Sequence, residues 1–122
     1  MSENARRKVA VVVDDQAVRD SLQFLLEVVG HSVETFASAT EFLNADVANF
    51  SCLILDHHMP EMTGLELAEK LLTQSAGIPM LLVTGAPSPT IVARANELGV
   101  TRVLEKPPNE EDILDFINAM RP

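Results

Sequence analysis

The sequence predicts an α/β fold of the doubly wound class, in which helices cover both faces of a five-stranded parallel sheet. Apolar runs typical of strands alternate with amphipathic segments typical of helices, five times along the 122 residues. This alternation indicates parallel strands joined by helical crossovers. Three of the runs are apolar on consecutive residues, which suits strands that are covered on both faces. The length is that of one ordinary domain, so we expect residues 1–122 to form a single one.

The predicted strands differ in how apolar they are, and this difference predicts their order in the sheet. The first, third and fourth are continuous apolar runs at Val9–Val13, Cys52–Leu55 and Met80–Val83. The second, Ser32–Phe36, alternates polar and apolar residues, and the fifth, Thr101–Glu105, is mixed. Half-exposed strands belong at the edges of a sheet. We therefore expect the strand order 2-1-3-4-5, a common one for doubly wound sheets.

Each predicted helix has a signal at one end. The first has an apolar stripe and stops at Gly30. Capping boxes, in which a hydroxyl residue precedes Glu by three positions, begin the second and third helices at Ser38–Glu41 and Thr63–Glu66. Ser88-Pro89 begins the fourth helix and Asn109 caps the fifth.

Charge and cysteine content exclude several classes of protein. Nine Lys plus Arg against 18 Asp plus Glu give a formal net charge of −9, which repels phosphate backbones, so we expect no direct nucleic-acid binding by this domain. A single cysteine, Cys52, excludes an internal disulfide and a multi-cysteine metal site. No apolar run approaches the ~20 residues of a membrane span, and the polar N-terminus is not a signal peptide. We expect a cytoplasmic protein without membrane contact.

Five polar residues follow the carboxyl ends of predicted strands, where doubly wound sheets bind ligands. They are Asp14, Asp15, Asp56, Thr84 and Lys106. Two carboxylates ~4 Å apart repel by about 4 kcal/mol at an effective dielectric near 20, so a cation must compensate. Oxygen donors without a thiol select a hard divalent ion such as Mg²⁺. With a lysine and a hydroxyl opposite, the cleft suits a phosphoryl group, and the candidate nucleophile is a carboxylate.

These residues, in this order, resemble the receiver domain of two-component response regulators. The motifs are Asp14-Asp15, Asp56-His57-His58-Met59-Pro60 followed by Gly64, Thr84-Gly85 and Lys106-Pro107. The resemblance covers Val9 to Met120. It implies a signalling switch that catalyses only its own phosphorylation and dephosphorylation and is not otherwise an enzyme.

The resemblance assigns roles to the acidic positions. It implies that Asp56 accepts a phosphoryl group. It also implies that Asp15, Asp56 and the backbone carbonyl of His58 ligate Mg²⁺ directly, whereas Asp14 holds the ion mainly through water. The implied donor is a sensor histidine kinase or a phosphotransfer protein.

The resemblance also implies a switch. Lys106 pairs with the phosphoryl oxygens, Thr84 turns inward to hydrogen-bond one of them, and the Lys106–Pro107 peptide is cis. The surface of the fourth helix, fifth strand and fifth helix then repacks, as a population shift that a downstream effector protein or an output domain reads. A phosphorylation-dependent homodimer is a further form compatible with the family. The family usually has Tyr or Phe three residues before the lysine, where this sequence has Val103.

Two other functions stay open at this point. Val103 favours an atypical receiver that binds a protein partner independently of phosphorylation, whereas the intact Asp56, Thr84 and Lys106 argue against it. A Mg²⁺-dependent phosphohydrolase or phosphotransferase with an aspartyl intermediate usually needs a general acid two residues after the nucleophile, where His58 stands. A chain this short also lacks a cap domain to enclose a substrate.

The two adjacent histidines, His57 and His58, suggest at first a transition-metal site with Asp56. Neighbouring residues at a strand end point to opposite sides, which makes joint ligation awkward. We therefore expect an exposed loop pair, and we hypothesise that the imidazole of His58 alters the lifetime of the acyl phosphate by shielding or orienting water.

Overall fold

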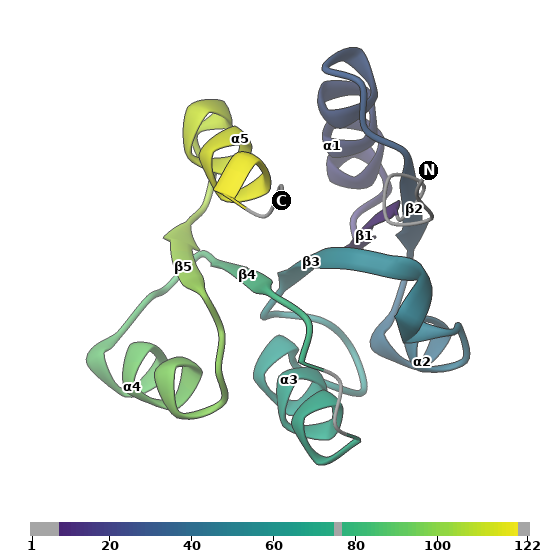
Figure 1. Cartoon of the computed structure of the whole chain (residues 1–122). Coiled ribbons are helices and arrows are strands. Elements are labelled where there is room, and N and C mark those ends of the chain that lie inside the picture. The colour runs from purple at the N-terminus through teal and green to yellow at the C-terminus, as the bar shows by residue number, and fades with distance from the viewer. Residues whose placement is uncertain (1–7, 75–76, 120–122) are drawn as a thin grey trace.

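The computed structural model describes residues 8–74 and 77–119, and it contains one five-stranded sheet flanked by helices (Figure 1). The elements in chain order are β1 Lys8–Val12, α1 Gln16–Val28, β2 Val33–Phe36, α2 Ala39–Leu43, the 3-10 helix η2 Val47–Asn49, β3 Phe50–Asp56, α3 Gly64–Thr73, β4 Met80–Thr84, α4 Pro89–Glu97, β5 Arg102–Glu105 and α5 Glu110–Ala119. All strand pairs are parallel and the order is β2-β1-β3-β4-β5. This confirms the predicted fold class and strand order.

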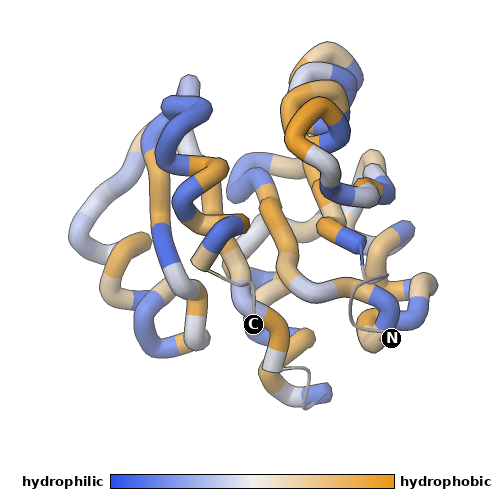
Figure 2. The backbone as a smooth tube through the Cα atoms, turned by 45° about the horizontal axis from the view of Figure 1, so that its top comes forward, coloured by the Kyte–Doolittle hydropathy of each residue, from blue (hydrophilic) through white to orange (hydrophobic). Residues whose placement is uncertain are grey.

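The helices form two layers, with α1 and α5 on one face of the sheet and α2, α3 and α4 on the other (Figure 1). Side chains of β1, β3 and β4 alternate between two hydrophobic clusters. The cluster beneath α1 and α5 includes Val9, Val11, Ile54 and Leu81. The opposite cluster includes Ala10, Val12, Leu53, Leu55 and Leu82. Both faces of these strands are therefore buried, which explains their consecutive apolar residues. The helices, in contrast, show alternating hydrophilic and hydrophobic bands along the chain (Figure 2).

The helix caps agree with the sequence signals at three of the four predicted positions. Thr63 and Glu66 form a complete capping box, Ser88 accepts from the Ile91 amide, and Asn109 accepts from the Glu111 amide. At α2 the predicted box is wrong in one detail. Ser38 does accept from the Glu41 amide, but the Glu41 carboxylate reaches one residue further back and accepts from the Ala37 amide at 3.0 Å.

Three phenylalanine rings pack together at the β2 side of the molecule. Phe36, Phe42 and Phe50 come from β2, α2 and the start of β3, and their ring centroids lie 5.3–5.8 Å apart. The Phe36 ring contacts both others edge-on, a favourable geometry for aromatic pairs. This cluster fastens the edge strand β2 and the short helix α2 to the centre of the sheet.

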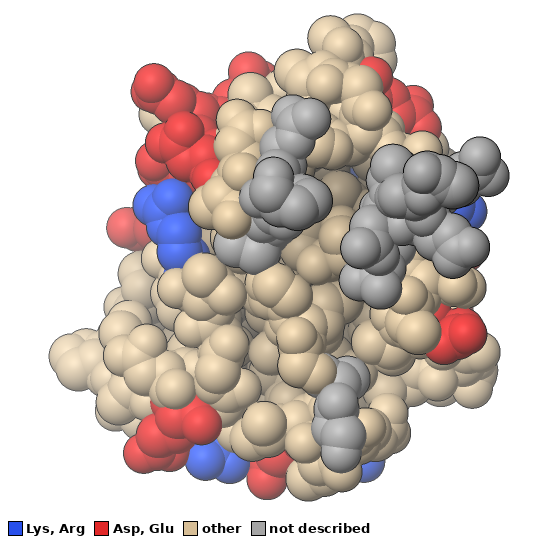
Figure 3. Space-filling view, viewed as in Figure 1, with Lys and Arg blue, Asp and Glu red and all other residues tan. Residues whose placement is uncertain are grey.

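Acidic side chains gather over α5 on the face seen in Figure 3. The first turn of α5 contains Glu110, Glu111 and Asp112. Arg102 of β5 pairs with one of them, Asp112, at 3.8 Å. Acidic groups in the first turn of a helix interact favourably with its positive end. Within the described part of the chain, no helix is long and apolar enough to cross a membrane.

Cys52 provides a pH-dependent test of the fold. Its side chain is buried on β3, and burial raises the pKa of its thiol from 9.0 to about 11, against a smaller lowering by the Ser51 hydroxyl. Between these values the unfolded chain releases the thiol proton before the folded one does. We therefore expect the wild type to lose roughly 2 kcal/mol of stability as the pH rises from 9.0 to 11, relative to Cys52→Ala.

Urea denaturation midpoints of the two proteins at both ends of this pH range measure the effect. At pH 9.0 the absolute stability of Cys52→Ala will be lower because a buried sulfur is removed. Only the change with pH in the stability difference between the two proteins measures the ionisation of the Cys52 thiol. Parallel losses in both proteins contradict the prediction.

Candidate functional site

The carboxyl ends of four strands bring polar residues to one edge of the sheet. Asp56 is the last residue of β3 and Thr84 the last residue of β4. Asp14 and Asp15 follow β1 after one intervening residue, Val13, and Lys106 follows β5, where its amide donates to the Thr84 carbonyl at 2.9 Å. These five residues were all predicted to converge on one cleft. The strand order brings four of them to the same groove, whereas Thr84 is not among its lining residues.

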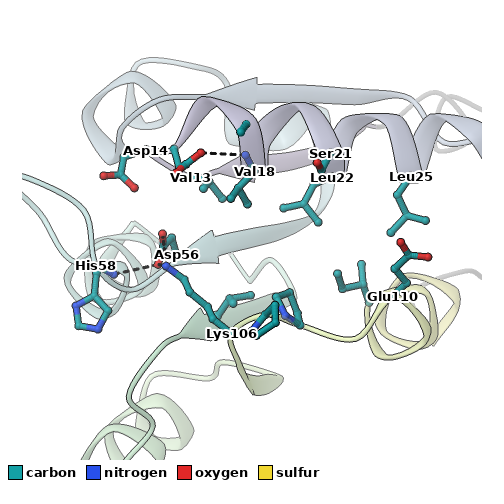
Figure 4. Close-up of a pocket in the computed structure, with 16 residues that line it drawn as sticks. Val13, Asp14, Val18, Ser21, Leu22, Leu25, Asp56, His58, Lys106 and Glu110 are labelled. Atoms are coloured by element: carbon teal, nitrogen blue, oxygen red, sulfur yellow. Dashed lines mark hydrogen bonds and ion pairs between the residues drawn. The ribbon is translucent and has the colours of Figure 1, made fainter.

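A groove of about 790 Å³ opens at this edge between α1 and α5 (Figure 4). Asp14, Asp15, Asp56, His58 and Lys106 all line it. The groove continues along α1 and α5 past apolar side chains. These include Val18, Leu22, Leu25 and Ile113. The groove thus has three aspartates at one end and mainly apolar side chains along its length, with Glu110 opposite Leu25 (Figure 4).

Asp56 is the most buried carboxylate of this edge, with 2% of its surface exposed. Lys106 Nζ lies 2.8 Å from each of its two oxygens, and the His58 amide donates to Oδ1 at 3.1 Å. A buried carboxylate without such partners is strongly unfavourable. The Lys106 side chain is itself 38% exposed, so it reaches Asp56 from the solvent side. The peptide bond that follows it, Lys106–Pro107, is cis, as predicted.

Asp15 and Asp14 lie on the loop between β1 and α1. Asp15 is the N-cap of α1, because its Oδ1 accepts a hydrogen bond from the Val18 amide at 3.1 Å. The side chain of Asp14 is exposed. Across residues 8–74 and 77–119, no three His, Cys, Asp or Glu side chains are already clustered in a way that could hold a metal ion. The carboxylates of Asp14, Asp15 and Asp56 nevertheless line the groove, and no thiol does; carboxylate oxygens are donors that suit Mg²⁺.

Thr84 does not line the groove and is completely buried behind it. Its Oγ1 accepts a hydrogen bond from the Ala86 amide at 3.2 Å and lies 3.4 Å from Nε2 of His58. His58 is exposed, so its imidazole covers the threonine hydroxyl from the solvent side. The sequence did not predict this contact.

The two histidines do not form the exposed pair that the sequence predicted. Their ring centroids are 5.0 Å apart in an edge-on arrangement, because the chain leaves β3 at Asp56 and the strand alternation ends there. His57 is half-buried, and its Nδ1 is buried without a hydrogen-bond partner. Burial, reinforced by the neighbouring His58, lowers the pKa of His57 below its ordinary 6.5. The His57 ring is therefore neutral at pH 7.

Gly64 lies against the loop that follows Asp56. Its amide donates to the His57 carbonyl at 3.0 Å. A Cβ atom at this position would lie 2.7 Å from the Asp56 carbonyl oxygen and 2.7 Å from Cδ1 of Leu82. The close packing of α3 on this loop thus requires glycine.

Val103 lies half-buried on β5, paired in register with Leu82 on β4. It packs against the same hydrophobic cluster as Ile91 of α4. The position at which the resemblance leads us to expect an aromatic ring is therefore filled by a small aliphatic side chain that contacts the core.

Arg19 is a residue of this edge that the sequence analysis missed. Its Nη1 donates to the carbonyl oxygens of Val13 at 2.7 Å and Asp14 at 2.9 Å. From the sequence, an arginine near the start of an amphipathic helix is expected to have a solvated side chain. No sequence signal identifies backbone carbonyls as its partners.

The fold and this edge define a class: a doubly wound α/β protein with a lysine-paired, buried aspartate at the carboxyl end of its third strand. The chain belongs to the response regulator receiver domain family, whose model matches residues 9–118. This confirms the resemblance. The chain therefore contains a receiver domain of a two-component response regulator, which is not a family of general catalysts.

Several characterised proteins are similar to this chain. It is 36% identical over 112 residues to the transcriptional regulatory protein TdiR of Thauera aromatica, covering 91% of this chain and 49% of TdiR. It is 35% identical to FixJ of Bradyrhizobium diazoefficiens, covering 91% and 55%. The chain thus spans about half the length of these relatives. A CheY-like receiver domain from Methanospirillum hungatei superposes with a TM-score of 0.84 at 33% identity, covering 93% of this chain and 91% of that one.

Proposed function

We propose that residues 1–122 act as one phosphoacceptor receiver domain, in which Asp56 accepts a phosphoryl group from a sensor histidine kinase or a phosphotransfer protein. The observation that supports this most directly is the position of Asp56, buried at the groove with Lys106 Nζ 2.8 Å from both of its oxygens. A lysine held there neutralises the carboxylate in the resting state and is in place to meet added phosphoryl oxygens.

In the proposed transfer, an oxygen of Asp56 forms a bond to phosphorus while the bond from phosphorus to the donor's imidazole nitrogen breaks. The electron pair of that bond stays on the imidazole. The product is an acyl phosphate on Asp56, with roughly 1.5 to 2 negative charges and three acceptor oxygens. Lys106 pairs with these oxygens in place of the free carboxylate. Hydrolysis by water later returns the aspartate.

We assign Asp14, Asp15, Asp56 and the backbone carbonyl of His58 as the groups that would hold Mg²⁺. All four residues line the same groove. The α1 cap uses only Oδ1 of Asp15, so its Oδ2 is left for the metal. Bound magnesium supplies positive charge that offsets the carboxylates and the incoming phosphoryl oxygens. Asp56 is held in position for this by Lys106 and the His58 amide.

The proposed switch runs from Thr84 to the surface of α4, β5 and α5. For the Thr84 hydroxyl to reach a phosphoryl oxygen, it must leave the Ala86 amide and the His58 ring. The movement of Thr84 lets the adjacent β5 and α4 repack, so phosphorylation shifts the population toward a second conformation. A downstream effector protein or an output domain reads this surface, and pairing of two copies through it is a further outcome.

The relatives suggest the kind of output. TdiR and FixJ are transcriptional regulatory proteins about twice as long as the part that matches this chain. We propose that this receiver controls an output of the same regulatory kind, through a protein contact. The net charge of −9 argues against direct nucleic-acid binding by the receiver itself.

The test is intact mass measurement after incubation with a small-molecule phosphodonor. With Mg²⁺ the chain should gain one phosphoryl group, and with a chelator it should gain none. An unchanged mass in Mg²⁺ would favour the second candidate, a receiver that binds its partner independently of phosphorylation. The half-buried Val103, in place of an aromatic ring, is the observation that favours this alternative.

We predict that His58 lengthens the lifetime of the acyl phosphate. His58 lines the groove beside Asp56, and its Nε2 lies 3.4 Å from the Thr84 hydroxyl, so we expect the imidazole to limit the approach of water. The variant His58→Ala should lose its phosphoryl group several-fold faster than the wild type. The decay of phosphorylated protein measured by intact mass gives both rates, with His31→Ala as a control, since His31 follows the C-terminal end of α1 and does not line the groove. Identical rates for His58→Ala and wild type would refute the role.

A further inference from the structure

The loop that carries Asp14 and Asp15 is held in place by one guanidinium group, that of Arg19 on α1. One nitrogen of Arg19, Nη1, donates to two consecutive carbonyls, those of Val13 at 2.7 Å and Asp14 at 2.9 Å. The amide of Arg19 also donates to the Asp15 carbonyl at 3.0 Å. Three successive peptide carbonyls, from the end of β1 to the N-cap of α1, are therefore fixed by one residue.

This choice of partners is informative because Arg19 has acidic neighbours. The side chains of Asp14, Asp15 and Asp20 are all exposed nearby in the sequence, and an arginine usually pairs with such carboxylates. The Arg19 guanidinium instead binds the backbone, and it leaves the carboxylates of Asp14 and Asp15 directed to the groove that they line. The start of α1 does not need this contact, since Asp15 already caps it.

The orientation of a peptide plane determines the direction of the side chains on either side of it. Fixing the carbonyls of Val13 and Asp14 fixes the two peptide planes that flank Asp14 and thereby the direction in which Asp14 and Asp15 leave the chain. Groups that orient metal ligands from outside the ligand shell typically change metal affinity by 10- to 100-fold when they are mutated.

We propose that Arg19 is a positioning residue for the divalent-cation site, where it orients the Asp14–Asp15 pair through the backbone. This rests on the proposed function of that site. The proposal predicts a change in cation affinity opposite in direction to the change that electrostatics alone predicts. Removing a positive charge beside a cation site should tighten cation binding if charge dominates, whereas losing the backbone contacts should weaken it.

The experiment is calorimetric titration of the purified chain with Mg²⁺ in the absence of phosphodonor. We expect Arg19→Gln to bind Mg²⁺ roughly ten-fold more weakly than the wild type, and Arg19→Lys to recover part of this loss because an ammonium group can also donate to carbonyls. Arg94→Gln is the matched control, since Arg94 pairs with Glu69 and Glu97 on an exposed surface of α3 and α4. It should bind Mg²⁺ as the wild type does.

Phosphorylation kinetics separate positioning from general damage. For Arg19→Gln, the Mg²⁺ concentration that gives half the maximal phosphorylation rate should rise, while the rate at saturating Mg²⁺ stays at the wild-type value. Equal or tighter Mg²⁺ binding by Arg19→Gln would overturn the inference and leave the phosphoacceptor function intact. Conversely, a wild type that binds Mg²⁺ but never gains a phosphoryl group would overturn the proposed function while the role of Arg19 still stands.

Discussion

Asp56→Asn is expected to abolish the gain of a phosphoryl group from a small-molecule phosphodonor in Mg²⁺. The amide has nearly the same shape as the carboxylate and can still accept from the His58 amide, but its oxygen is a poor nucleophile and it does not bring a negative charge to the metal. Because Asp56 is buried with 2% exposed, the substitution also removes a buried charge. The variant should therefore remain folded, and intact mass measurement should show only the unmodified chain.

Asp115→Asn is the matched control, since Asp115 is an exposed carboxylate on α5 away from the groove. It should gain one phosphoryl group at the wild-type rate. A phosphoryl group on Asp56→Asn would contradict the assignment and direct attention to Asp14 or Asp15, which line the groove at the same edge of the sheet.

Gly64→Ala is expected to destabilise the protein by about 1–3 kcal/mol. The added methyl group would lie 2.7 Å from the Asp56 carbonyl oxygen and 3.0 Å from the His57 Cα. Both are backbone atoms, so α3 or the loop after Asp56 has to move. The change is destabilising even though alanine is a better helix former than glycine by roughly 1 kcal/mol and Gly64 begins α3.

Urea denaturation midpoints measure this effect, and Gly77→Ala is the comparison. A Cβ atom at Gly77 would meet no atom within 4 Å, so its stability should change by no more than about 0.5 kcal/mol. Equal midpoints for the two variants would show that α3 yields easily. A shift of the loop in Gly64→Ala should also slow phosphorylation, because that loop positions the His58 amide on Asp56.

The strand order and the edge that carries the site were predictable because both follow from short-range patterns. Continuous apolar runs identified β1, β3 and β4 as central strands, and a parallel sheet necessarily brings their carboxyl ends together. This order puts β3 and β5 on either side of β4, so Asp56 and Lys106 lie at the same edge of the sheet and the long lysine side chain spans β4 to reach the carboxylate. The separation of 50 positions between them in the chain made no difference.

The contacts that were not predicted depend on where a side chain turns after its strand or helix has ended. His57 and His58 meet edge-on because the strand alternation stops at Asp56. Glu41 reaches the Ala37 amide where the residue pattern favours the cap residue itself. Arg19 binds carbonyls, which every residue has, so residue types alone do not distinguish it from a solvated arginine.

The cluster of Phe36, Phe42 and Phe50 makes one flank of the molecule more rigid than the other. It anchors the flank of β2 and α2 with large interlocking rings, whereas β5 and α4 on the opposite flank have only aliphatic and polar side chains. Sliding or tilting aliphatic side chains past each other requires less displaced volume than turning a packed ring. We therefore expect the aromatic flank of β2 and α2 to stay fixed in any rearrangement. The backbone of β5 and α4 should move, because moving it costs less free energy.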